Sequence, residues 1–184
     1  MKFSNRIASR SFAPTLVAGI ALFSLHSTAH ADSYNITVTN HMDKELLAPV
    51  LVAPVSADPN IFKKQYVTQE AETQILTGDP AKLAERIGND VTVAHGNDGP
   101  PGVLLAPGKS ISFKVKTKAS AVRLISMVAP TKVPDNFVTG IINLKAPVDI
   151  TLERYDIGHN EGNKEISHVS TGSATVKISR SMGM

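Results

Sequence analysis

The chain of 184 residues contains no cysteine and no tryptophan. Without cysteine, disulfide bonds, thiolate nucleophiles, iron–sulfur clusters and sulfur-ligated zinc are excluded. Aromatic residues are also scarce. Beyond residue 31 they are Tyr34, Tyr66, Tyr155, Phe62, Phe113 and Phe137. Because bases and sugars are commonly held on aromatic stacking platforms, neither ligand is expected here.

An excess of charge of either sign is missing once the first 31 residues are set aside. Lys2, Arg6 and Arg10 are three of the 19 basic residues, and none of the 16 acidic residues lies in that stretch. The rest of the chain is therefore neutral. Since phosphate contacts need an excess of Lys and Arg on one face, we expect no nucleic-acid partner.

Residues 1–31 have the pattern of a secretory signal peptide. Basic residues precede an apolar stretch at 16–25, and Ala29-His30-Ala31 supplies small residues for cleavage. The apolar stretch is too short to cross a bilayer, and no later run reaches about 18 apolar residues. We expect cleavage after Ala31, rather than a retained anchor. The product would be one exported domain over 32–184, periplasmic or extracellular, without a membrane span.

Apolar and polar residues alternate with a period of two in several short stretches, as they do in half-buried β-strands. The pattern is clearest at 34–39 and 111–116, and shorter versions occur at 148–152 and 176–178. Turn-forming Pro and Gly residues separate the stretches. Many short strands joined in this way predict an all-β fold, an antiparallel β-sandwich.

One segment has the pattern of a helix instead. Asp79 can cap its start, Pro80 suits its first turn, and Gly88 can end it. We therefore predict a single short helix over 79–87. The Ser/Thr-rich stretch 170–173 is typical of a turn before the last strand.

Oxygen-bearing side chains lie where strands are expected to end. They include Asp135 and, in a second stretch, Asp156 and Asn160. Gly158 and Gly162 would let the backbone curl so that oxygens four residues apart face one point. Calcium takes roughly 6–8 oxygen ligands and suits such a loop. A solvated turn explains the same spacing, and the glycine and glutamate positions of an EF-hand are not matched.

Histidines offer a rival interpretation, a metalloenzyme in which a β-sandwich gathers several of them around zinc or copper. The candidates are His41, His95, His159 and His168. None stands two or four residues from another, and no Gly-x-Ser-x-Gly elbow is present. We therefore expect a non-enzymatic protein.

Several short motifs occur along the chain in a characteristic order. They are the opening strand at 34–40, Leu83-Ala84-Glu85 with Gly88, the turn at 105–110, Ser126-Met127-Val128, Asp135-Asn136-Phe137-Val138, and Tyr155-Asp156-Ile157-Gly158. In this order they resemble the spondin N-terminal domain, which occurs in F-spondin and mindin and alone in secreted bacterial proteins. The resemblance covers nearly the whole expected domain.

The resemblance implies a C2-like β-sandwich with a calcium ion held between loops at one end. The family's metal-binding acids fall on Asp135 and Asp156, and its third acid falls on Asn160. Because an amide oxygen ligates without adding charge, the resemblance implies a weak calcium site here, and the adjacent Glu161 offers a substitute carboxylate.

Three functions follow as hypotheses. The leading one is an exported binding or adhesion module that presents a cation-stiffened loop end to an unknown protein or cell-surface partner. The alternatives are the periplasmic histidine-ligated metalloenzyme and a structural subunit that assembles through an exposed sheet edge.

Overall fold

The structure, a computed structural model, describes residues 31–129, 135–146 and 149–180. Residues 1–30 of the predicted signal peptide lie outside this range. Among the described residues, no helix combines the length and the apolar character needed to cross a membrane.

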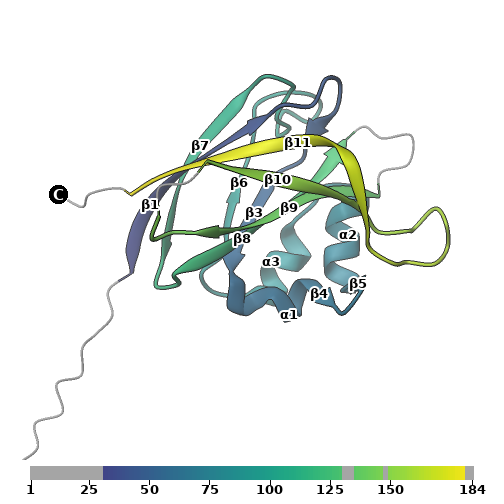
Figure 1. Cartoon of the computed structure of the whole chain (residues 1–184), viewed down its shortest axis with the longest axis horizontal. Helices are drawn as coiled ribbons and strands as arrows, with labels where there is room; N and C mark the ends of the chain where they lie inside the picture. The colour runs from purple at the N-terminus through teal and green to yellow at the C-terminus, as the bar shows by residue number, and fades with distance from the viewer. Residues whose placement is uncertain (1–30, 130–134, 147–148, 181–184) are drawn as a thin grey trace, which may run out of the picture.

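Strands dominate the described residues (Figure 1). The strands are β1 (Asp32–Asn40), β2 (Leu46–Leu47), β3 (Val50–Pro54), β4 (Phe62–Lys63), β5 (Tyr66–Val67), β6 (Thr92–Ala94), β7 (Ser110–Thr117), β8 (Ala121–Ala129), β9 (Asn136–Asn143), β10 (Asp149–Asp156) and β11 (Ser167–Arg180). The helices are η1 (Val55–Ala57), α1 (Asp58–Ile61), α2 (Gln69–Thr77) and α3 (Ala81–Ile87).

One antiparallel sheet of nine strands forms the body of the domain. Its strand order is β6-β3-β8-β9-β10-β11-β1-β7, with β2 beside β8, while β4 and β5 form a separate hairpin. The sheet curls over on itself until it nearly closes, and its inner face encloses an aliphatic core to which all the long strands contribute. The predicted all-β antiparallel fold is therefore confirmed.

The strands predicted from alternation have the expected faces. In β1, Tyr34, Ile36 and Val38 are buried in the core. In β7 the even-numbered residues Ser110, Ser112, Lys114 and Lys116 are exposed. The period of two is visible in these strands because water covers their outer face.

The helices cover only part of the outer face. Figure 1 shows them grouped on one side of the sheet, against β3, β8 and β9. Apolar side chains of the helices, including Ile61, Ile75 and Leu83, pack there against Ile125 and Phe137 of the sheet. A second core is thus buried between the helices and this half of the sheet.

The helix predicted over 79–87 is confirmed as α3, which begins two residues later, at Ala81. The Asp79 carboxylate accepts a hydrogen bond from the Ala81 amide at 2.9 Å, and Gly88 follows the last turn. Helices α1 and α2 were not predicted. In α2, Thr68 caps the start and Gly78 ends the helix with φ of 77°, but apolar residues are too few to show a period.

The stretch 170–173 is not a turn, because β11 continues through it. Leu152 of β10 pairs with Ala174, whereas Arg154 pairs with Val169, so the register shifts between these two pairs. The prediction of a turn before the last strand was therefore wrong. The extra residues are accommodated by an irregularity in the ladder rather than by a break in the strand.

A row of rings crosses the outer face where the helices end. Phe137 lies 6.4 Å from Phe62 and 5.7 Å from Tyr155 between ring centroids, and His168 meets Tyr155 edge-on at 5.3 Å. Arg123 sits over the Phe62 ring. The row ties the β4–β5 hairpin to β9, β10 and β11, beside the strand ends that carry the predicted acidic residues.

Candidate metal centre

Antiparallel pairing of β9 and β10 brings the two predicted acidic residues together. Asp156, the last residue of β10, is the register partner of Asn136, the first residue of β9. One residue further out, the Ile157 amide donates to the main-chain carbonyl of Asp135 at 3.1 Å. The two acids, 21 positions apart in sequence, therefore share one end of the sheet.

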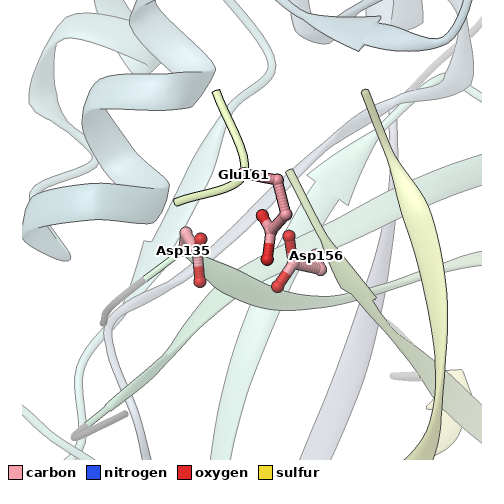
Figure 2. Close-up of side chains that lie close together, drawn as sticks. All are labelled: Asp135, Asp156 and Glu161. Atoms are coloured by element: carbon pink, nitrogen blue, oxygen red, sulfur yellow. The ribbon is translucent and has the colours of Figure 1, made fainter. Parts of the chain in front are cut away.

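A third carboxylate completes the cluster. One oxygen each of Asp135, Asp156 and Glu161 lies within 4.8 Å of the others, and Figure 2 shows the three side chains gathered around one space. Asp135 is fully buried, Asp156 is half-buried and Glu161 is exposed. The site therefore opens to solvent on the Glu161 side.

The loop that carries Glu161 curls at glycines. Gly158 and Gly162 have φ of 63° and 72°, values that favour glycine. A Cβ atom at Gly158 would collide with the Asn163 side chain and meet the backbone of Glu165. The expectation that these glycines let the loop curl is confirmed.

Polar contacts fasten this loop to its neighbours. Glu72 of α2 contacts both Lys164 Nζ at 3.2 Å and His159 Nδ1 at 3.3 Å. The Ile166 amide donates to the carbonyl of Gln65 in the β4–β5 turn at 2.8 Å. The loop is thus attached at both ends to the helix-covered side of the domain.

Asn136 connects the two aspartates of the cluster. Its Nδ2 donates to Asp135 Oδ1 at 3.1 Å and to Asp156 Oδ2 at 2.9 Å. Its Oδ1 accepts from Arg154 Nε at 2.8 Å. Because the guanidinium can only donate, this bond fixes the orientation of the amide with its NH₂ group toward the carboxylates.

Main-chain amides bind the remaining oxygens of both aspartates. Gly158 N donates to Asp156 Oδ1 at 2.6 Å, and Asn160 N donates to Asp135 Oδ2 at 3.3 Å. Each carboxylate oxygen has two lone pairs and uses one in these bonds. The side chains are therefore held in place with acceptor capacity left for another group.

The chemistry and spacing of the three carboxylates fit a hard cation. Among the described residues, none of the three pairs with Lys or Arg, since Arg154 bonds Asn136 and Glu45 instead. Calcium–oxygen distances of about 2.4 Å would place ligand oxygens up to about 4.8 Å apart. Hydrogen bonds that orient the ligating carboxylates are usual around metal sites.

Asn160, the position implied for the third ligand, lies next to the cluster. Its main-chain amide bonds Asp135 and its side chain is exposed. The neighbouring Glu161 supplies the third carboxylate. The role of the Asn160 amide oxygen as a ligand remains a prediction, and Glu161 lies where a substitute carboxylate was expected.

Among the described residues, the four candidate histidines form no shared cluster of metal ligands. His41 contacts Thr175, His159 contacts Glu72, and His168 packs on Tyr155. In the part of the chain that the structure describes, no group of three potential ligands includes a histidine. The geometry thus gives no support to a histidine-ligated centre.

Comparison with known proteins adds nothing to this geometry, because no family model and no curated protein matches the chain. Resemblance to the spondin N-terminal domain therefore rests on the motif order alone.

Proposed function

We propose that the protein is an exported, non-enzymatic binding module whose loop end is stiffened by calcium. The observation that carries the proposal is the convergence of Asp135, Asp156 and Glu161 within 4.8 Å. Export is supported by the pattern of residues 1–31, and the calcium class by the all-oxygen donor set.

The cation would act on the relative positions of three chain segments. Asp135 precedes β9, Asp156 ends β10, and Glu161 lies in the following loop. Without a cation, the three negative charges repel one another, and the exposed Glu161 is the one that can move away. A bound ion would favour the closed arrangement, so part of its binding free energy becomes local folding free energy.

The proposed partner surface is a pocket beside the site. A pocket of about 300 Å³ is lined by Tyr66, Val67, Glu72, Ile157, Gly162, Asn163 and Lys164. Four of these residues belong to the loop that carries Glu161. Holding the loop with calcium would therefore fix the shape of the pocket that a partner meets.

Thermal unfolding with chelator and with 10 mM calcium tests the proposal. Extracellular calcium modules bind at about 10⁻⁴–10⁻³ M. At ten times the dissociation constant, calcium would stabilise the fold by about 1.4 kcal/mol. For a domain of this size, the melting temperature would rise by about 3–6 °C. An unchanged melting temperature would remove calcium from the function.

Variants assign the ligands. Asp156→Asn should abolish the calcium response. It should also lower stability in chelator, because both Asp156 oxygens accept hydrogen bonds, from Gly158 N and Asn136 Nδ2, and an asparagine amide can accept only one of them. Asp149→Asn, at the opposite end of β10, is the matched control and should keep the response. Glu161→Gln and Asn160→Ala then decide which of the two residues supplies the third ligand.

A further inference from the structure

One edge of the sheet is formed by β7, which contributes no residue to the acidic site. This strand is the last in the strand order and pairs only with β1. The backbone groups on its other side have no strand partner among the described residues, and such groups are the usual template for an added strand.

On the side away from β1, β7 has no strand partner among the described residues. β6 stands at the other end of the strand order and approaches β7 without pairing with it. β6 has three residues and β7 has eight. The shorter strand therefore cannot cover the whole edge.

The exposed side chains of β7 and its flanks include four lysines. Lys109, Lys114, Lys116 and Lys118 are all exposed, and the described residues give none of them an ion-pair partner. Within the register of β1 and β7, the one carboxylate is Asp32, opposite Thr117 at the strand end. This edge therefore carries a local positive charge on a chain whose expected mature part is neutral.

The inward side chains of β7 leave apolar surface open at the same edge. Val115 is 1% exposed, whereas Ile111 and Phe113 are only partly buried against the inner core. A neighbouring strand with apolar inward side chains would cover them. The core thus ends at this edge without a strand to complete it.

We infer that β7 binds an extended acidic segment of a partner protein, which adds to the sheet as a further strand. In such a strand alternate side chains lie about 6.8 Å apart on one face. Acidic residues at every second position would meet Lys114 and Lys116, and the apolar residues between them would cover Ile111 and Phe113. A second copy of the chain fits poorly, because antiparallel pairing of two β7 edges brings basic strands together.

The inference goes beyond the proposed function, because β7 contributes nothing to the calcium site. The probe is a fluorescent ten-residue peptide that alternates Glu with Val, followed by anisotropy. A peptide of the same composition, with five Glu followed by five Val, is the control for charge without alternation. Binding should be weakened by salt and unchanged by chelator.

Charge-reversal variants locate the binding surface. Lys114→Glu with Lys116→Glu should weaken binding by at least about tenfold. Lys44→Glu with Lys82→Glu makes the same change in net charge on exposed residues elsewhere and should leave binding nearly unchanged. Hydrogen exchange should show new protection of β7 amides only with the alternating peptide.

Several results would overturn the inference. They are no binding at millimolar peptide, equal weakening by both variant pairs, equal binding of the two peptides, or protection outside β7. Binding of β7 to anionic phospholipid vesicles but not to the peptide would assign the basic edge to a membrane surface instead. A concentration-dependent dimer lost in the β7 variant would make the partner a second copy.

Discussion

The two halves of the sheet share one inner core but differ on their outer faces. Over β3, β8 and β9 the helices bury the outer face, and β8 has six buried residues among nine. Along β1 and β7 the outward side chains are polar and partly or fully exposed. The comparison shows that one sheet can pack helices against one half of its outer face and leave the other half in contact with water.

Each half also holds its polar groups differently. At the covered half, Arg123 forms a two-bond pair with Asp58 at 2.7 Å, and both side chains are largely buried. At the open half, Thr37 and Thr39 of β1 bond Ser112 and Ser110 of β7 through exposed hydroxyl groups. Burial makes the first kind of contact costly to break, whereas water can replace the second.

The largest expected effect is a loss of stability, compared between two phenylalanine-to-alanine variants, one from each half. Phe137→Ala should lower the free energy of unfolding by about 3–5 kcal/mol, because the ring is fully buried. Phe113→Ala should cost about 1–2 kcal/mol, because its ring is only partly buried at the β7 edge. Urea unfolding of both variants checks this, and equal losses would contradict the contrast between the halves.

A smaller effect of opposite sign is expected inside the covered half. Gln74 of α2 is fully buried, and neither atom of its amide group has a hydrogen-bond partner among the described residues. Gln74→Met should raise the free energy of unfolding by about 1–3 kcal/mol, because it removes the desolvation cost.

The exposed Gln69→Met in the same helix is the control for Gln74→Met and should have little effect. If Gln74→Met lowered stability instead, the amide group would have an unrecognised partner, such as an internal water.

The smallest expected effect is on the pH dependence of stability, and it concerns Tyr155, at the border between the halves. Its hydroxyl donates to Glu153 Oε2 at 2.6 Å, and this bond, together with burial, raises the Tyr155 pKa above its ordinary value of 10.0. The folded state therefore holds the proton more tightly than the unfolded chain does. The resulting stability is present below pH 10 and is lost as the pH rises through the folded pKa.

Unfolding measurements between pH 9 and pH 11 in the wild type and in Tyr155→Phe test this. In Tyr155→Phe the free energy of unfolding should not show the additional decrease at high pH. In Tyr66→Phe, on the exposed hairpin, the decrease should remain. If the free energy of unfolding fell with pH as steeply in Tyr155→Phe as in the wild type, other groups would be the cause of the loss of stability.

The open half could be predicted from sequence, and the covered half largely could not. The four strands recognised by alternation are β1, β7, β10 and β11, which are neighbours in the sheet. β3 and β8 were not recognised, because strands buried on both faces have apolar runs instead of a period. α2 was missed because its stability comes from packing on the sheet more than from its own pattern.

The site was predicted in part. Asp135 and Asp156 were named from their motifs, and the register of β9 and β10 places them together. Asn136 was not recognised as the group that bridges them, although it follows Asp135 directly. No pattern in the sequence reveals that its amide lies opposite Asp156, because that pairing depends on which strands become neighbours.

Sequence alone determined the all-β class, the alternating strands, helix α3 and the glycines that curl the 157–166 loop. These features depend on local conformational preference and on which side chains avoid water, and both are properties of short segments. Only the tertiary structure decided that Glu161 faces two aspartates and that β7 is left at an edge. Those outcomes depend on strand order and on how far the sheet curls, which arise from contacts between residues distant along the chain.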